Sequence, residues 1–343
     1  MLRRIIRIAA AAGVLFLLGG CVRIDDRTPE KTPDGAIIFD AWSLLLNDDA
    51  SKSVEPKDNI GENDEFFVYG AKTIDGNQVD VFDGTLVRFV SSLWNYDNIR
   101  FWDPQASRYD FLAIAGPRST AGISCNPANS GLVSARVVYN AVLAECDLKA
   151  ACSQRISDDE GRWTDERRQQ VSLTDPVDLE FHPLLSPVSV SVTNRSNDEI
   201  TLQSWRFQNI AVGGEVSVVQ DPSGVPGFSW NHTAYSYSTP VLGVSFIEPV
   251  ALPPDSSYPG LWADMMIPQE LTGIAYEPQI ILSYAFREGN DTRSRILTIP
   301  LSQVRAIGSD APMTVWEPGI WYEYVITILS GGAVSVIVAT TNE

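Results

Sequence analysis

The feature that most constrains the fold is a strict alternation of apolar and polar side chains in short segments of the chain. In residues 188–193 every second side chain is a valine, and residues 321–328 place tyrosine or isoleucine at every second position. This period of two is typical of a strand with one buried face, because successive side chains of a strand point to opposite faces. The pattern predicts an all-β protein.

Other segments share the composition of strands. They are rich in Val, Ile, Phe, Tyr and Trp and are bounded by Gly, Pro, Asn and Asp. Asp75-Gly76-Asn77 predicts a hairpin turn between two of them. Many short strands with intervening turns favour β-sandwiches over a parallel sheet with crossover helices. The remaining strand candidates are residues 36–42, 66–69, 71–74, 79–82, 86–90, 108–115, 200–207, 280–286 and 333–340.

Two segments depart from this pattern. Residues 131–151 are expected to form a strand followed by a short helical turn near 147–151. Residues 153–176 are rich in charges and have no apolar period, so we expect an exposed linker or a long loop there. A domain boundary near its end would divide the mature chain into residues 36–176 and 177–343.

The N-terminus predicts export. A basic head with three arginines precedes an apolar run over residues 8–18, which is shorter than the roughly 20 residues that a membrane-spanning helix needs. Leu18-Gly19-Gly20-Cys21 resembles the lipobox of bacterial lipoproteins, in which the cysteine becomes the first mature residue and carries the lipid. The alternative is an ordinary signal peptide in which Cys21 is incidental.

We therefore expect residues 1–20 to be a lipoprotein signal peptide, with the covalent lipid on Cys21 and no other cofactor or metal. Residues 21–35 are polar and would form a flexible tether. Within them, Asp25-Asp26 resembles the acidic signal that sends some lipoproteins to the outer face of the outer membrane. The alternative is a plain solvated linker.

The charge excludes one class of partner. Beyond residue 20 there are 22 basic and 43 acidic residues, a net charge of −21. Such a surface repels phosphate backbones, so nucleic acid is not an expected partner. Export permits disulfides, and Cys125, Cys146 and Cys152 could form one bridge or remain buried thiols.

No catalytic constellation is visible. The chain has two histidines, His182 and His232, and lacks a nucleophile elbow, a phosphate-binding glycine loop and a metal-ligand spacing. We therefore expect a protein without enzymatic activity. The mixture of aromatic and small polar residues at 228–237 is typical of a binding loop, and we expect Trp230, Tyr235 and Tyr237 to form a contact surface.

Several fragments, in this order after the lipobox, resemble the fimbrillin-like lipoproteins, which are subunits and accessory subunits of type V pili. The resemblance covers nearly the whole mature chain. Lys149 departs from it, because the family usually has Met there. The fragments are Trp94-x-Tyr96 with Trp102, Tyr109-Asp110-Phe111-Leu112-Ala113, Asp147-Leu148-Lys149-Ala150, Val177-x-Leu179-x-Phe181-His182-x-Leu184, Val188-x-Val190-x-Val192 and Trp316-Glu317-Pro318-Gly319-Ile320-Trp321-Tyr322-Glu323-Tyr324.

The resemblance implies two tandem transthyretin-like β-sandwiches and assembly with other pilus subunits by β-strand addition. In the family, proteolysis removes the first strand together with the lipid, and the next subunit supplies a strand to the groove. Here the candidate donor is residues 333–340, with Val334, Val336 and Val338 as groove fillers. The alternative is that this strand completes its own sandwich.

The cleavage pattern departs from the family. After the first strand candidate, no arginine occurs before Arg88. This favours an anchor, tip or accessory subunit that keeps its lipid, on the outer membrane or in a fimbrium, with a host protein or glycan as a receptor. The alternative function is a surface glycan-binding lipoprotein that captures polysaccharide.

Overall fold

The fold is that of an all-β protein, as predicted. A computed structural model describes residues 33–42, 64–116, 124–127, 133–142, 147–236, 243–259, 264–288 and 291–342. In these ranges every regular element is a strand apart from two 3₁₀ turns, η2 (Leu301–Gln303) and η3 (Ser330–Gly332). No helix among them has the length and apolar character of a membrane span. Residues Asp34–Glu343 form one compact unit.

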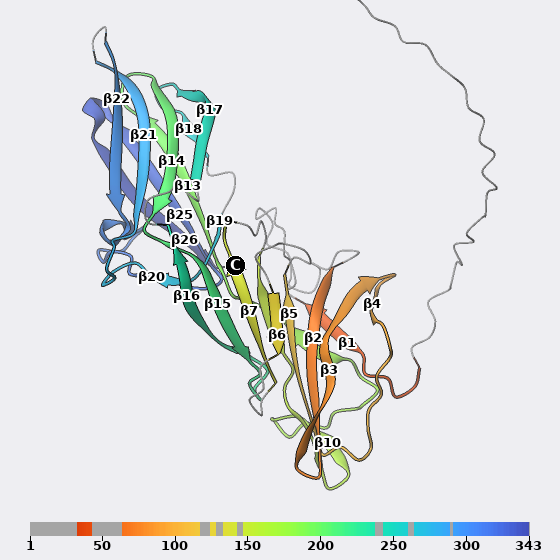
Figure 1. Cartoon of the computed structure of the whole chain (residues 1–343). Coiled ribbons are helices and arrows are strands. Elements are labelled where there is room, and N and C mark those ends of the chain that lie inside the picture. Colours follow the sequence, from red (N-terminus) through yellow and green to blue (C-terminus); the bar gives the residue numbers. More distant parts are fainter. Residues whose placement is uncertain are drawn as a thin grey trace, which may run out of the picture. The chain divides into compact units, whose positions relative to one another are not determined.

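The first half of the chain builds an eight-stranded sheet covered on one side by a pair of strands (Figure 1). The pair consists of β1 (Phe39–Trp42) and β11 (Val177–Glu180), which run parallel. The strands of the eight-stranded sheet are β2 (Glu65–Ile74), β3 (Asn77–Val90), β4 (Leu93–Tyr96), β5 (Arg108–Ala115), β8 (Lys149–Cys152), β9 (Ile156–Asp159), β10 (Arg162–Thr164) and β12 (His182–Pro183).

Strand β5 is the centre of this sheet and is buried on both faces. Phe111, Ala113 and Ala115 belong to a first core, which the sheet shares with β1 and β11. Leu112 and Ile114 point the other way, into a second core. The sequence predicted the bounds of β5 but only one buried face.

Three further sheets share the second core. The bridging sheet is β16 (Gly227–Tyr235), β15 (Ala211–Val219), β7 (Ser134–Asn140) and β6 (Ser124–Pro127). The outer sheet is β17 (Gly243–Leu252), β14 (Ile200–Gln208), β21 (Gln279–Glu288) and β22 (Asp291–Pro300). The six-stranded sheet is β18 (Ser257–Tyr258), β13 (Ser186–Arg195), β25 (Ile320–Leu329), β26 (Val334–Asn342), β23 (Arg305–Ala306) and β19 (Asp264–Met266), and β20 (Gln269–Glu270) pairs with β24 (Val315–Trp316).

These sheets form two sandwiches over one continuous core. The bridging sheet packs on the eight-stranded sheet, and the outer sheet packs on the six-stranded sheet. The final motif of the resemblance lies in the second sandwich, where the buried Trp316 indole donates to the Tyr324 hydroxyl at 2.9 Å. Burial raises the pKa of that tyrosine, which keeps it protonated.

A long hairpin connects the two sandwiches (Figure 1). Only Asn209 and Ile210 separate β14 from β15, so the outgoing arm passes directly from the outer sheet into the bridging sheet. The returning arm is β16 followed by β17. Gly213 and Gly214 lie at register shifts within this hairpin, and a side chain at Gly214 would approach the Asn231 carbonyl to 2.9 Å. The glycine pair therefore lies at irregular pairing inside one strand and is not a turn between two strands.

The tip of the hairpin is docked on the eight-stranded sheet. The Arg155 amide donates to the Pro222 carbonyl at 3.1 Å, and the Cys152 thiol donates to the Asp221 carbonyl at 3.5 Å. The Arg155 guanidinium also contacts the buried Asp110 carboxylate at 2.9 Å. Both arms and the tip of the hairpin are therefore held.

Two local predictions are wrong. Residues 153–176 contain the hairpin of β9 and β10, which extends the eight-stranded sheet, and are not a bare linker. The expected helical turn near 147–151 is strand β8, which pairs with β5. In both places tertiary pairing with a sheet decides the conformation of a segment whose own composition is not that of a strand.

The boundary near residue 176 stays a prediction about folding units. Strand pairing crosses this boundary, since β15 pairs with β7 and β11 pairs with β1.

The predicted turn at Asp75-Gly76 is confirmed, because both residues have positive φ, as a two-residue hairpin turn requires.

Candidate functional site

The candidate donor strand, β26, completes its own sandwich in this structure. Val338 is fully buried, and Val334 and Val336 are partly buried against the second core. The three valines share one face, and Ile337, on the opposite face, is 40% exposed. The inward valines and the outward Ile337 alternate as expected of a strand that fills a groove, and the groove that β26 fills here is that of its own sandwich.

The two edges of β26 differ. One edge pairs with β25 over the whole strand, from Ile320 opposite Asn342 to Ile328 opposite Val334. On the other edge, β23 pairs only with Ile337 and Val338, and the Ile307 amide adds a hydrogen bond to the Val338 carbonyl at 2.9 Å. Within the described part of the chain, the rest of this edge has no strand partner. An edge of this kind can accept a further strand.

The first strand, β1, is held mainly by its side chains. Ile37 and Ala41 are fully buried, and Phe39 is 5% exposed. The Phe39 ring lies 5.4–6.1 Å from four other rings in edge-to-face geometry, those of Phe66, Phe82, Tyr96 and Phe111. Its backbone partner in the described residues is β11, over four residue pairs.

Hydrogen bonds fix both ends of this segment. The Tyr96 hydroxyl donates to the Ile37 carbonyl at 2.6 Å, and burial raises the pKa of Tyr96. At the other end the Trp42 indole donates to Asp178 at 2.8 Å. Together these contacts seat a short strand in a groove lined by aromatic side chains.

The predicted contact surface is not a loop. Residues 227–235 are strand β16, an edge strand of the bridging sheet. Trp230 packs against the second core, and its indole donates to the Leu184 carbonyl at 3.1 Å, so it has a structural role at the junction of the sandwiches. Tyr235 is 37% exposed, whereas Tyr237 lies outside the described residues. The structure does not bring Trp230 and Tyr235 to one face, because they are five positions apart on the strand.

Some predicted residues fall outside the described ranges, among them Cys21, the tether before residue 33 and Cys146. Cys125 lies in β6. Cys152 is a free, buried thiol, and burial raises its pKa to about 11. It therefore takes no part in the disulfide that the sequence allowed.

The His, Cys, Asp and Glu side chains of the described residues do not gather into a metal site. No group of three or more His, Cys, Asp or Glu side chains in these ranges is placed to hold a metal. The His232 ring is within 2.9 Å of the Pro268 carbonyl, and His182 lies in β12 opposite Ala150. These are packing roles in two different sheets.

Comparison with known proteins gives structural matches only. No family model matches the chain, and no curated protein sequence does. Solved structures of similar topology include a protein assigned to cell adhesion from Bacteroides uniformis, with 15% identity, a TM-score of 0.46 and coverage of 90% of this chain and 98% of that one. Another such protein, from Parabacteroides distasonis, has 10% identity, a TM-score of 0.46 and coverage of 89% and 100%. The tip fimbrial protein Mfa3 from Porphyromonas gingivalis has 12% identity, a TM-score of 0.39 and coverage of 91% and 100%.

Proposed function

We propose that this chain is a cell-surface lipoprotein with a structural and adhesive role in a pilus, joined to neighbouring subunits by β-strand addition. In this proposal Cys21 carries the lipid. The chain acts as an anchor, tip or accessory subunit rather than as a processed shaft subunit.

The observation that carries the proposal is the partly open edge of β26, where a partner strand can add while every strand of this chain stays in place. The groove of β1 has the geometry that strand addition uses, because the backbone of β1 pairs over four residues while its side chains fill an aromatic groove.

The position of Arg88 supports retention of β1. This residue lies inside β3, opposite both Glu65 and Asn95, and its guanidinium is 3.5 Å from the Glu65 carboxylate. Proteases cut mobile exposed segments more readily than paired strands. An arginine-specific protease would have to break the eight-stranded sheet to cut there, which favours a role in which β1 stays in its groove.

The N-terminus of the mature protein tests the anchoring role. Metabolic labelling with palmitate in a lipoprotein-processing host should label the wild-type chain and leave Cys21→Ser unlabelled. The mass of the labelled protein should correspond to residues 21–343 plus lipid. A mature protein that begins after residue 50 would contradict the anchoring role.

A pair of β26 variants tests strand addition. Val336→Asp places a charge on the inward face, whereas Ser335→Asp places it on the exposed face of the same strand. We expect Val336→Asp to abolish SDS-resistant ladders or incorporation into sheared filaments, and Ser335→Asp to retain them. Thermal melting of the isolated proteins distinguishes lost assembly from lost folding. Ladders that persist in a folded Val336→Asp variant would count against strand addition through β26.

A further inference from the structure

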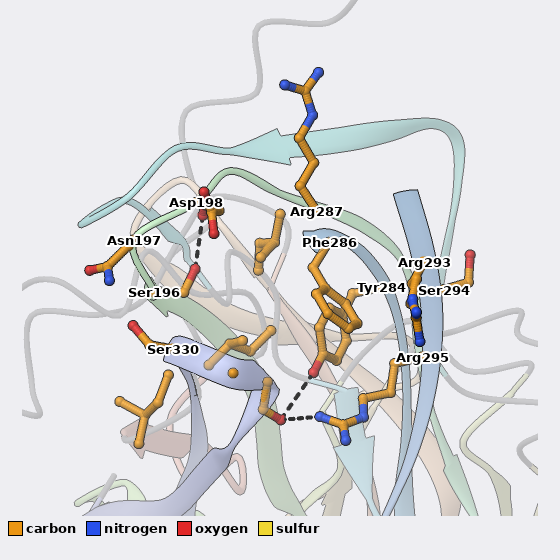
Figure 2. Close-up of a pocket in the computed structure, with 15 residues that line it drawn as sticks. Ser196, Asn197, Asp198, Tyr284, Phe286, Arg287, Arg293, Ser294, Arg295 and Ser330 are labelled. Atoms are coloured by element: carbon orange, nitrogen blue, oxygen red, sulfur yellow. Dashed lines mark hydrogen bonds between the residues drawn. The ribbon is translucent and has the colours of Figure 1, made fainter. Parts of the chain in front are cut away.

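A pocket of about 580 Å³ opens at one end of the second sandwich (Figure 2). Its walls come from the loop between β13 and β14, the ends of β21 and β22, and the turn η3 between β25 and β26. The volume is within the range of small-ligand sites, about 300–1,000 Å³. Neither β1 nor β26, the strands discussed for assembly, lines this pocket. Its only link to them is η3, the turn that directly precedes β26.

The pairing of β21 with β22 brings arginines to this pocket. Arg293 is opposite Phe286, and Arg295 is opposite Tyr284. Residues directly opposite each other in a sheet share a face. Both arginines therefore lie on the same face of the sheet as Tyr284, whose side chain is buried in the core. Further along β22 the same face carries Leu297 and Ile299, which pack against the second core. The face thus changes from apolar to cationic where the sandwich opens.

Arg295 is positioned in advance. Its guanidinium donates to the Gly332 carbonyl, which also accepts the Tyr284 hydroxyl at 3.5 Å (Figure 2). Gly332 has φ +73°, and a side chain at this position would collide with the guanidinium. A guanidinium has five N–H donors, so this contact leaves others directed at the pocket.

The rim adds neutral and acidic polar groups. Asn197, Asp198 and Ser330 line the pocket, and the Ser196 hydroxyl donates to the Asp198 carbonyl at 2.8 Å, which orders that loop. Phe286 is half-buried and offers an apolar surface. Arg287 also lines the pocket, although Figure 2 shows its guanidinium pointing away from the other two arginines.

The local charge opposes that of the whole chain. The lining contains three arginines and one carboxylate, whereas the protein has 25 basic and 43 acidic residues. Arginine forks bind carboxylates in bidentate geometry. The neighbouring Asp198 carboxylate would repel a phosphate dianion more strongly than a carboxylate monoanion, and it can accept hydroxyl donors. These groups together fit a ligand that has one carboxylate, several hydroxyls and a ring.

We propose that this pocket binds a carboxylate-bearing sugar of a surface glycan. Its carboxylate would bind the Arg295 guanidinium, with Arg293 adding positive charge nearby. Its hydroxyls would bind Asp198 and Ser330, and its ring would lie on Phe286. The inference does not rest on the proposed assembly role, because the site is complete within one chain.

Titration calorimetry on the chain from residue 21, with Cys21→Ser to prevent lipidation, tests the inference. The probes are glucuronic acid and N-acetylneuraminic acid, with glucose and inorganic phosphate as controls. We expect at least one acidic sugar to bind at millimolar concentration or tighter and the two controls at least tenfold more weakly. Arg295→Gln should weaken the acidic sugar at least tenfold.

Two further variants keep the result interpretable. Arg293→Gln replaces Arg295→Gln if the latter lowers the melting temperature. Arg162→Gln removes an exposed arginine of the eight-stranded sheet and should leave binding unchanged. The inference is overturned if neither acidic sugar binds, if glucose or phosphate binds equally well, or if Arg162→Gln weakens binding as much as the pocket variants do.

Discussion

The first strand, β1, and the last strand, β26, are held in their sandwiches by different interactions. β1 pairs over four residues with β11 and buries Phe39 and Ala41 in the first core, together with Ile37, which precedes the strand. β26 pairs over nine residues with β25, and only Val338 of its three inward valines is fully buried. Side-chain burial dominates at one end of the chain and backbone pairing at the other.

This difference indicates which strand can be exchanged and which edge can be extended. Apolar burial is non-directional, so a groove that selects side chains accepts any strand with the right spacing. A backbone ladder fixes the register of its strands, and the unpaired N–H and C=O groups on its free edge can pair with another strand. We therefore expect the stability effect of a substitution in β1 to depend on the side-chain volume that it removes. In β26 the effect should depend on whether the substituted side chain faces the core or solvent.

The largest effect is expected for Phe39→Ala. Removing a ring that touches four others should lower the free energy of unfolding by about 3–5 kcal/mol, measured by urea unfolding. Phe39→Leu keeps most of the volume and should cost less than about 1.5 kcal/mol. A loss below about 1 kcal/mol for the alanine variant would show that burial does not hold β1.

A smaller effect is expected in β26. Val338→Ala removes two buried methyl groups and should cost roughly 2 kcal/mol in thermal or urea unfolding. Ile337→Ala, on the exposed face, should change stability by less than about 0.5 kcal/mol. Equal costs for the two variants would contradict the facing of this strand.

A pH effect should act on the sandwich that contains β26. Burial raises the pKa of Asp264, in β19, from 3.8 to about 6. The folded state therefore disfavours the charged carboxylate, and this contribution makes stability fall as pH rises from about 4 to about 6. A pKa shift of this size corresponds to about 3 kcal/mol at pH 7. Because the side chain is partly exposed and solvent screens its charge, we expect a penalty of about 1–2 kcal/mol.

Asp264→Asn removes this titration. The variant should be more stable than the wild type at pH 7 and should lose its advantage at pH 4, as measured by urea unfolding at both values. A difference that is the same at both pH values would mean that the carboxylate does not titrate in this range.

The smallest effect concerns the buried Cys152 thiol as a reporter. Cys152 and Val177 of β11 line a cavity of about 300 Å³, so loosening β1 and β11 should expose the thiol. In a Cys21→Ser, Cys125→Ala, Cys146→Ala background, labelling by iodoacetamide should be slow and should accelerate a few-fold with Phe39→Ala. Val338→Ala should not accelerate it, and equal acceleration would show that the two ends of the chain are coupled.

The sequence predicted the class of the fold and many strands because period-two patterns are local. β5 was predicted at its exact bounds, and the Asp75-Gly76 turn has the required positive φ values. Polar strands were missed, as in β9 and β10, because their conformation comes from pairing with β5 and not from their own composition.

The candidate sites were harder to predict from the sequence than the strands were. The facing of Val334, Val336 and Val338 followed from alternation, but a sequence cannot show whether a strand fills its own groove or another. Residues 228–235 were interpreted as a loop because small polar residues hid the strand, and the contact role of Trp230 and Tyr235 stays a prediction. The sequence contained one sign of the pocket: every second residue of β22 from 293 to 299 is first arginine and then apolar. This pattern indicates a pocket only once the structure shows that η3 forms another of its walls.

The hairpin that runs from β14 through β15 and returns through β16 and β17 has a mechanical consequence. A subunit on a cell surface is pulled when its ligand or its neighbours move. Each arm of the hairpin passes from one sandwich into the other, and the Asn209 amide donates to the Ser236 carbonyl at 2.6 Å where the arms cross. Tension between the sandwiches would therefore be shared by two hydrogen-bonded segments rather than by a single linking peptide. Such a chain should yield under force as one unit, and the docked tip at Pro222 would be a contact that must break early.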